Sequence, residues 1–308
     1  MKITVFGTGG VGGYFGARLA QGGCDVGFVA RGANLAALRS DGLRVRSPLG
    51  DADLTGVRAG DEPADLGTPD VVIVSVKLWD LADALRALAP IVGEETCVLS
   101  LQNGVQKDEL LARAFGEGAV MGGVAYISAL LEAPGVVRHN GPIARLVLGE
   151  PGGVRSPRLE ALHAACVRGG IDATISDDVR RTTWEKFVFL VAMSATTAAM
   201  RSNIGPIRTH PRSRAFLLGV LREVVAVGRA HGVPLAPGYA DDRLAFIDGL
   251  PAGMEASMYA DLQRGRRLEL PWLSGAVVEL GAAHGVDVPL NRVVNDLLAI
   301  HELGTSGR

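Results

Sequence analysis

The sequence predicts an α/β fold, with a doubly wound domain over residues 1–176 and an all-α domain over residues 177–308. Two observations predict this arrangement. Short apolar runs rich in β-branched residues alternate with helical patterns as far as Ser176, and beyond that residue only long helical patterns remain. The chain has 308 residues, 48% of them hydrophobic, so it is long enough to bury a core in each domain.

A glycine-rich turn follows the first predicted strand. The apolar run Ile3–Phe6 stops at Gly7, further glycines stand at Gly9 and Gly12, and an Ala/Leu helical pattern then runs to residues 21–23. This G-x-G-x-x-G sequence is typical of a Rossmann-like dinucleotide site, where the glycines permit the tight turn, the backbone's approach to a pyrophosphate and close helix packing. The alternative is a corner without a ligand, since 41 glycines produce such spacings by chance.

Strand and helix patterns alternate through the rest of the first domain. The run Val71–Val76 is almost wholly apolar, as a central parallel strand buried on both faces would be. The last three strands would form an antiparallel addition. In chain order we expect strands at residues 25–30, 43–46, 71–76, 97–101, 120–128, 135–139 and 145–149, and helices at residues 34–40, 78–92 and 107–115.

The second domain is predicted to consist of helices at residues 177–200, 214–230 and 273–283. The first of them is apolar around its whole circumference beyond Lys186, which is typical of a helix buried within a bundle. The other two end alike, with a histidine in the last turn, then glycine, then proline. Because this pattern marks a helix stop, we interpret His231 and His284 as capping residues and not as catalytic ones.

The composition narrows the classes of function. A formal net charge of -2 gives no field that would attract nucleic acid, and without an apolar run of about 18 residues we expect no membrane span. Glycines interrupt the apolar run behind Lys2, so we expect no signal peptide. The six histidines are dispersed, which argues against a metal site. Cys24, Cys97 and Cys166 lie in apolar segments and predict buried, reduced thiols in a cytoplasmic protein.

The end of the second strand indicates which dinucleotide would bind. An NAD enzyme usually carries Asp or Glu there to hold the ribose 2′-hydroxyl, whereas this chain has Arg31 and no carboxylate. A guanidinium can hold a 2′-phosphate through parallel hydrogen bonds, so Arg31 favours NADP. The alternative is that Arg31 is a solvated loop residue.

Two polar residues follow buried strands at the edge where ligands of open α/β sheets collect. Lys77 follows the strand at 71–76 and can reach a cofactor phosphate or adenine; Asn103 follows the strand at 97–101 and can reach the nicotinamide ribose or the substrate. Either residue alone is more often part of a turn. Their position at one edge favours a binding role.

Lys186 is conspicuous because fourteen uncharged residues follow it. It could be a lysine whose stem lies along a buried helix while its amine reaches water. Alternatively it is a general acid, because partial desolvation and the positive end of a helix both lower the pKa of a lysine, and a ketone that accepts hydride needs a proton donor. Glu269 precedes Pro271, which suits the first turn of the next helix, where a carboxylate stays ionised and could orient the lysine or a substrate hydroxyl.

Seven short segments, in a specific order and spacing, resemble one known family. They are GTGGVG at 7–12, SVK ending at Lys77, LQNG around Asn103, PGVVRHNG at 134–141, WEK at 184–186, ASM at 256–258 and RRLEL ending at Leu270. Over nearly its full length the chain is similar to the ketopantoate reductase (2-dehydropantoate 2-reductase) family. The resemblance implies an NADPH-dependent reduction of a 2-oxo acid, in pantothenate biosynthesis.

The resemblance also implies roles for single residues. Lys186 would donate the proton, Glu269 would serve the substrate side, and Ser257 would hydrogen-bond the substrate carboxylate. The residues that we expect to bind the cofactor are Gly7, Thr8, Gly9, Gly10, Val11, Gly12, Arg31, Lys77, Asn103 and Ala125.

The helix after the lysine departs from the family pattern. The family's pantoate-forming enzymes have asparagines four, eight and about eighteen positions after the lysine, where this chain has Leu190, Ser194 and Ile204. Lys186, Leu190 and Ser194 are each one helical turn apart, so we expect them to line one wall of the substrate site. Losing the amides would weaken discrimination for a small polar substrate by about 1 to 3 kcal/mol per hydrogen bond. Arg201 and Asn203 could compensate.

Three hypotheses for function remain open. The first is reduction of ketopantoate, and the second is reduction of a bulkier, more apolar 2-oxo acid by the same chemistry. The third is a regulatory protein that senses NADPH without turnover, against which the joint presence of Lys186, Ser257 and Glu269 argues. The apolar helical half could supply a homodimer surface or simply be its own core.

Overall fold

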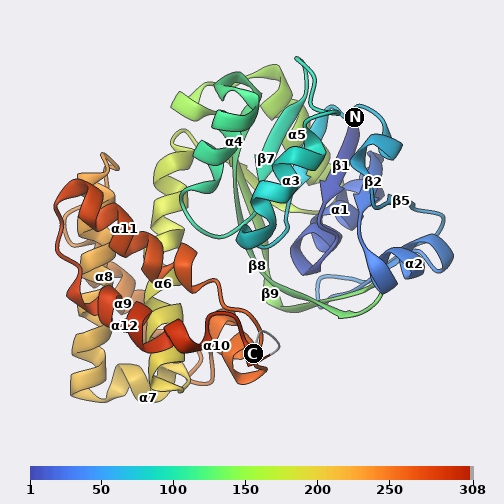
Figure 1. Ribbon diagram of the computed structural model, residues 1–308. Coiled ribbons are helices and arrows are strands. Elements are labelled where there is room, and N and C mark those ends of the chain that lie inside the picture. The colour runs from blue at the N-terminus through green and yellow to red at the C-terminus, as the bar shows by residue number, and fades with distance from the viewer. Residues whose placement is uncertain (306–308) are drawn as a thin grey trace. The chain divides into compact units, whose positions relative to one another are not determined.

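A computed structural model describes residues 1–305 (Figure 1). The chain divides into two compact units. The α/β unit comprises residues 1–102 and 106–182; the helical unit comprises residues 103–105 together with the chain from Thr183 onward. The α/β unit thus runs past the boundary expected after residue 176. No helix within residues 1–305 is both long and apolar enough to cross a membrane.

All the strands of residues 1–305 lie in the α/β unit. They are β1 Lys2–Phe6, β2 Asp25–Val29, β3 Leu43–Arg46, β4 Ala52–Leu54, β5 Arg58–Gly60, β6 Val71–Val74, β7 Cys97–Ser100, β8 Val120–Ala133, β9 Val136–Gly149 and β10 Asp172–Ile175. The parallel strands are arranged β5-β2-β1-β6-β7-β8, which is the order 3-2-1-4-5-6 along the chain and confirms the Rossmann-like prediction. The winding reverses at β1, so ligands are expected at its carboxyl end.

The addition to the parallel sheet is larger than the sequence analysis predicts. β8 and β9 are strands of fourteen residues each, and β9 replaces the two short strands expected at 135–139 and 145–149. They pair antiparallel, and β9 also pairs with β3 and β10. The short strands β4, β5 and β10 were not predicted, because each has only three or four residues and none is wholly buried.

The helices of residues 1–305 fall into two groups. Those of the α/β unit are α1 Gly10–Gln21, α2 Gly32–Ser40, α3 Leu81–Leu88, α4 Lys107–Phe115 and α5 Pro157–Arg168, and those from Val179 onward are α6 Val179–Met200, α7 Ile204–Thr209, α8 Pro211–Ala230, α9 Tyr239–Asp248, α10 Ser257–Gln263, α11 Ser274–His284 and α12 Pro289–Leu298. The helix predicted at 78–92 is shorter, because a 3-10 turn, Leu78–Asp80, precedes α3. The unpredicted α5 begins with a recognisable cap, in which Ser156 Oγ accepts a hydrogen bond from the Leu159 backbone N–H at 3.2 Å.

The core of the helical unit surrounds α6. Its residues 191–198 are all buried, as the apolar circumference predicted. Buried hydroxyls in this stretch bond to the helix itself: Thr196 Oγ1 donates to the Ala192 carbonyl and Thr197 Oγ1 to the Met193 carbonyl, both at 2.7 Å. Polar side chains can therefore lie inside the bundle without disrupting it.

The two predicted capping histidines lie where the sequence analysis expected them. His231 follows the last residue of α8, and His284 is the last residue of α11. The structure adds a contact that was not predicted, since Nδ1 of His231 and Nε2 of His284 are 2.9 Å apart. The ring of His231 also packs 5.6 Å from that of Trp184. The ends of α8 and α11 are thereby joined.

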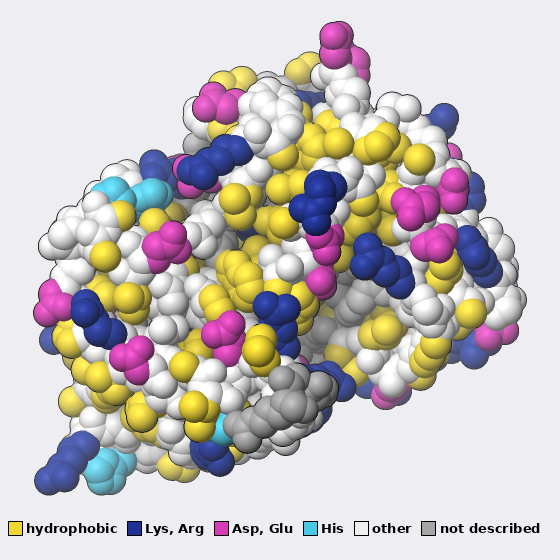
Figure 2. All heavy atoms as spheres, in the orientation of Figure 1, with side chains coloured by type: hydrophobic (Ala, Val, Ile, Leu, Met, Phe, Trp, Pro, Cys, Tyr) yellow, Lys and Arg dark blue, Asp and Glu magenta, His cyan; other side chains and the backbone are white. Residues whose placement is uncertain are grey.

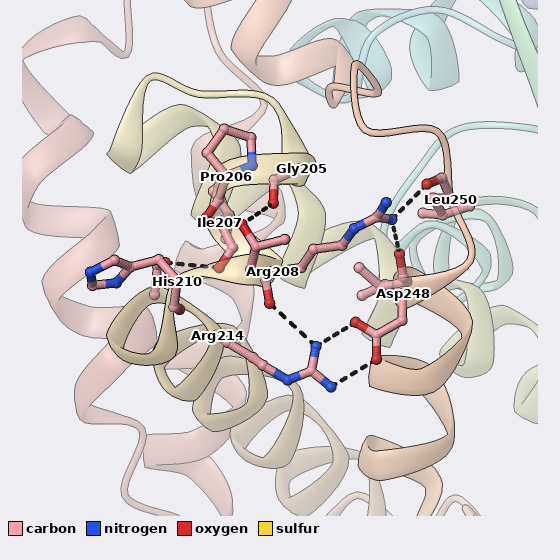
Figure 3. Close-up of polar contacts among 11 residues, drawn as sticks. Gly205, Pro206, Ile207, Arg208, His210, Arg214, Asp248 and Leu250 are labelled. Carbon is pink, nitrogen blue, oxygen red and sulfur yellow. Dashed lines mark hydrogen bonds and ion pairs between the residues drawn. The ribbon is translucent and has the colours of Figure 1, made fainter.

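An arginine network fixes α7, α8 and α9 to one another (Figure 3). Arg208 donates to the backbone carbonyls of Ile247 and Leu250 at 2.7 and 2.6 Å, which satisfies carbonyls at the end of α9. Arg214 forms a bidentate ion pair with Asp248. Its guanidinium holds the pKa of that carboxyl below its ordinary value. The network anchors the segment that leads from α9 to α10.

Candidate functional site

The three glycines of the turn after β1 have different surroundings, two crowded and one open. Gly7 has a φ of +100°, and a Cβ there would lie 2.7 Å from the Val76 backbone N. A Cβ on Gly12 would lie 2.1 Å from Ser75 Oγ and 2.4 Å from the Gly7 carbonyl oxygen. Gly9, the N-cap of α1, has no atom within 4 Å of its Cβ position. The roles predicted for the glycines, a tight turn, an open approach and close packing, match this geometry.

The turn is suited to a dinucleotide pyrophosphate. Gly9 provides no side chain to cap α1, and the first turn of this fully described helix has no acidic residue. The backbone at the start of α1 therefore faces open space with the positive end of the helix behind it. This is a cradle that a Cβ on Gly9 would fill.

Other residues of the G-x-G-x-x-G segment support the turn from within. Thr8 is buried, and its Oγ1 donates to the Val29 carbonyl at 3.0 Å, so its hydroxyl is directed to β2. A Cβ on Gly10 would lie 2.3 Å from the Ala129 carbonyl oxygen, which explains this glycine at a variable position of the motif. Val11 is half-buried against the core.

Arg31 lies where the argument for NADP requires a cation. It is the N-cap of α2, directly after β2, and it is exposed. Within residues 1–305 its guanidinium has no hydrogen-bond or ion-pair partner, unlike Arg39 and Arg58 nearby, which pair with Asp61 and Asp25. Arg31 is therefore available to a ligand phosphate.

The loops that follow β6 and β7 are held together. Ser75 Oγ donates to the Gly7 carbonyl at 2.8 Å, and Gln102 Nε2 donates to the Val76 carbonyl at 2.8 Å. The half-buried Lys77 has its ammonium 5.5 Å from the ring centre of Trp79. Ala125, in β8, is only 4% exposed and its side chain is part of the core. Any contact between Ala125 and a cofactor would therefore involve its backbone atoms.

Lys186 and Asn103 are 83 positions apart in the sequence and in direct contact. Lys186 Nζ donates a hydrogen bond of 3.0 Å to Asn103 Oδ1. Both residues are half-buried, and both belong to the helical unit. An amide oxygen that accepts from an ammonium orients it without supplying a second charge.

One part of the argument for Lys186 is wrong. The positive end of a helix was expected to act on Lys186, but α6 begins at Val179 and Lys186 is its eighth residue. Because the field of a helix terminus falls off within about one turn, the helix end contributes little at Lys186. Partial burial and the bond to Asn103 remain as the influences on its amine.

The face of α6 beyond Lys186 carries one unusual hydroxyl. Leu190 is half-buried, while Ser194 is 1% exposed and its Oγ has no hydrogen-bond partner within residues 1–305. Thr196 and Thr197, by contrast, bond back to the helix. A buried hydroxyl without a partner is costly, and Ser194 lies on the same face of α6 as Lys186.

Ile204, the third position at which the chain departs from the family's asparagines, lies in the interior. Ile204 is fully buried in the core of the helical unit, and its backbone N–H bonds to the Met254 carbonyl at 2.9 Å. The neighbouring Asn203 is exposed as the N-cap of α7. Of these two neighbours, only Asn203, named above as a residue that could compensate for the missing amide, is exposed.

Ser257 and Glu269 lie on different elements of the helical unit. Ser257 is the exposed first residue of α10. Glu269 is 6% exposed and precedes a 3-10 turn, Leu270–Trp272. The expectation that it begins the next helix is wrong, because Pro271 lies in that turn and α11 starts only at Ser274. A buried carboxylate here still matches a role beside the substrate.

Two supporting residues were not predicted. Asn34 joins the glycine turn to the β8–β9 hairpin, since its Nδ2 donates to the Thr8 carbonyl and its Oδ1 accepts from the Gly135 N–H, both at 2.8 Å. Lys107 is 2% exposed and bonds to carbonyls of β7 and β8. The sequence indicated the supporting role of Asn34 only through its position three residues after Arg31. It did not indicate a role for Lys107, because most lysines at the start of a helix are solvated.

The remaining reactive groups do not form a second site. Within residues 1–305 no three His, Cys, Asp or Glu side chains are grouped to hold a metal. All three thiols are free and buried, and burial raises the pKa of Cys97 and Cys166 to about 12. On the face shown in Figure 2, cationic and anionic side chains are interspersed, which is unlike the single-sign surface of nucleic-acid-binding proteins.

Comparison with known proteins gives consistent matches along most of the chain. Residues 3–153 match the family model described as ketopantoate reductase PanE/ApbA, and residues 178–302 match the model of its C-terminal part. The chain is 34% identical to a 2-dehydropantoate 2-reductase of Mesorhizobium japonicum, with 91% of each chain covered. The structure of a 2-dehydropantoate 2-reductase from Geobacter metallireducens is similar with a TM-score of 0.90 and 33% identity, covering 97% of this chain and 99% of that one. A ternary structure of D-mandelate dehydrogenase with NADH and anilino(oxo)acetate has the same fold, with a TM-score of 0.87, 98% of each chain covered and 20% identity.

Proposed function

Because the chain belongs to the ketopantoate reductase family, we propose that it reduces a 2-oxo acid to a 2-hydroxy acid with NADPH, and that ketopantoate is the first substrate to test. The observation that carries this proposal is the hydrogen bond of 3.0 Å from Lys186 Nζ to Asn103 Oδ1. It holds the ammonium in one orientation, as a proton donor to a developing alkoxide requires.

The chemistry divides between the cofactor and the chain. When bound, NADPH supplies the hydride that the carbonyl carbon accepts. Lys186 gives a proton from Nζ to the carbonyl oxygen, so the ketone becomes a hydroxyl and the ammonium becomes an amine that is reprotonated from solvent. Ser257 would donate its hydroxyl to the substrate carboxylate, and Glu269 would serve the substrate side of the site.

The cofactor preference rests on Arg31. An exposed guanidinium directly after β2, without a partner in residues 1–305, supports NADPH over NADH, because it can bind the 2′-phosphate through two parallel hydrogen bonds. The open backbone at Gly9 supports binding of the pyrophosphate.

The test is NADPH oxidation with ketopantoate and with a panel of bulkier 2-oxo acids. We expect Lys186→Ala to lower kcat by about 100- to 10,000-fold, the usual contribution of a general acid, while NADPH binding measured by cofactor fluorescence persists. If Lys186→Ala keeps the wild-type rate, the assignment of the proton donor is wrong. If wild-type protein binds NADPH but oxidises it with none of these acids, a sensor of NADPH is the better description.

One observation favours a second candidate, a bulkier and more apolar 2-oxo acid. Leu190 lies one turn from Lys186, where the family's pantoate-forming enzymes have an amide, and it is half-buried. We expect Leu190→Asn combined with Ser194→Asn to raise kcat/KM for ketopantoate and to lower it for an aromatic 2-oxo acid. Unchanged ratios would count against a substrate wall at these residues. Leu218→Asn, a change of the same kind on α8, is the control.

A further inference from the structure

Lys107 occupies a position that is rare for a lysine. Its side chain is 2% exposed, and its Nζ bonds to the Ser100 carbonyl at 3.0 Å, the Gly123 carbonyl at 3.1 Å and the Asp108 carboxylate at 2.8 Å. An ammonium has three N–H groups, so each can have its own acceptor. A buried charge satisfied in this way is a rigid junction, and none of the proposed chemistry involves it.

The composition shows that this lysine is unusual for the chain. Of its 31 basic residues, 27 are arginines and only four are lysines: Lys2, Lys77, Lys107 and Lys186. The chain thus uses arginine for nearly every surface cation. A compact ammonium can converge on three acceptors within one small space, which the planar fork of a guanidinium cannot. The geometry at Lys107 therefore requires a lysine.

The two carbonyls lie where strands β7 and β8 separate. The two strands pair at Val98 with Val120 and at Leu99 with Met121. Beyond these pairs, the ammonium of Lys107 bridges Ser100, the last residue of β7, and Gly123 in β8. The side chain of Lys107 thus connects the two strands beyond the last backbone pair between them. The loop that leads to α4 begins at the same point.

The loop that starts at Ser100 carries Asn103. Gln102 ties it to the loop after β6 through the Val76 carbonyl, and Ser100 Oγ donates to Gln102 Oε1 at 3.0 Å. Lys107 closes the other end of the loop, so Asn103 lies between two fixed points. Asn103 Oδ1 accepts the bond from Lys186 Nζ.

We propose that Lys107 is a positioning residue, whose buried ammonium fixes the loop 101–106 so that Asn103 can orient the Lys186 amine. The proposal rests on the proposed function for its kinetic consequence. Its structural consequence is independent of catalysis: without Lys107, Asn103 Oδ1 should spend less time as an acceptor for Lys186. An accepted bond favours the ammonium form, so loosening it lowers the pKa of Lys186.

The experiment uses Lys107→Met, Asn103→Ala and the double variant of the full chain, with Lys2→Met as the matched control at an exposed lysine. Pulsed acylation with acetic anhydride across a pH series, read by mass spectrometry, follows Lys186 directly, because only four lysine side chains can react. Steady-state kinetics with NADPH and the active 2-oxo acid give kcat and KM. Should Lys107→Met not fold, Lys107→Arg keeps the charge without the convergent geometry and takes its place.

We expect Lys107→Met to lower kcat about tenfold with little change in KM for NADPH, and Asn103→Ala to lower it about 100-fold. The pH midpoint of Lys186 acylation should fall in both, and Lys2→Met should match wild type. In the double variant kcat and midpoint should equal those of Asn103→Ala, because Lys107 acts through Asn103.

Two results would overturn the proposal. One is a wild-type acylation profile of Lys186 in Lys107→Met, and the other is a double variant in which the two losses multiply. If wild-type protein reduces no 2-oxo acid, the proposed function fails, whereas the acylation series still decides whether Lys107 positions Asn103.

Discussion

The glycine turn and the lysine face of α6 are specified by different means. At the turn, Gly7 and Gly12 are excluded from having side chains by neighbours at 2.1 to 2.7 Å, so the backbone itself is the binding element. On α6, the helix would form equally well with other residues at Leu190 and Ser194, and the chemistry belongs to side chains. The proposed cofactor side is thus fixed by sterics, whereas the proposed substrate side depends on which side chains the helix carries.

The largest expected effect contrasts two glycines of the turn. Gly12→Ala would place a methyl group 2.4 Å from the Gly7 carbonyl oxygen, so we expect about 1 to 3 kcal/mol of destabilisation together with a loss of NADPH binding. Gly9→Ala has no neighbour within 4 Å and a φ of -90°, so stability should be unchanged while NADPH binding weakens. Thermal unfolding and cofactor titration separate the two. Equal loss of stability in both variants would contradict the contrast.

Arg31 tests whether side chains also matter on the cofactor side. We expect Arg31→Ala to weaken NADPH binding about 10- to 100-fold and to leave NADH binding unchanged, because only NADPH has the 2′-phosphate. Arg39→Ala, at a nearby arginine that pairs with Asp61, is the control. A parallel loss for both cofactors would show that Arg31 does not read the phosphate.

Ser194 gives a smaller effect, on the substrate side. Its buried Oγ has no partner in residues 1–305, so Ser194→Ala should leave the protein as stable or make it more stable by about 1 kcal/mol, while KM for the 2-oxo acid rises. Thr197→Val is the matched control, because it removes a hydroxyl that donates to the Met193 carbonyl at 2.7 Å. If Ser194→Ala leaves KM unchanged, its hydroxyl does not contact the substrate.

The smallest expected effect is on how the stability of the fold depends on pH at acid pH. Burial opposes ionisation of Glu150, but hydrogen bonds from Arg158 and Ser156 outweigh it and lower its pKa from the ordinary 4.5; Arg214 lowers the pKa of Asp248 from 3.8. These carboxylates stabilise the fold above their ordinary pKa values, and the contribution is lost as pH falls below them. The free energy of unfolding can be measured by urea titration at a series of acid pH values. Because Glu150 is 6% exposed and Asp248 40%, Glu150→Gln should reduce the dependence of this free energy on pH more than Asp248→Asn does. The reverse order would contradict this.

The sequence predicted what local patterns determine. The buried parallel strands and the glycine turn follow from apolar runs and steric exclusion, and both were found. The long helix predicted at residues 177–200 was found as well, as α6 Val179–Met200. β4 and β5 were missed because each has only three residues, too few for an alternating or wholly apolar pattern to be recognised.

The site was predictable only where spacing alone decides. Spacing along a helix placed Lys186, Leu190 and Ser194 on one face, but a count of residues could not tell that Ile204 turns into the core and that Asn203 stays exposed. The bond from Lys186 to Asn103 spans 83 positions, and no local pattern encodes it. The role of Lys107 depends on two carbonyls that only the folded sheet brings together.

The three buried thiols make the chain convenient for labelling. Burial raises the pKa of Cys24, and that of Cys97 and Cys166 to about 12, so near neutral pH the reactive thiolate scarcely forms. A cysteine introduced at an exposed position would react first with a maleimide dye or a nitroxide. Probes can therefore be attached singly to the native chain, and the movements of the glycine turn or of the loop 101–106 can be followed without first removing its own cysteines.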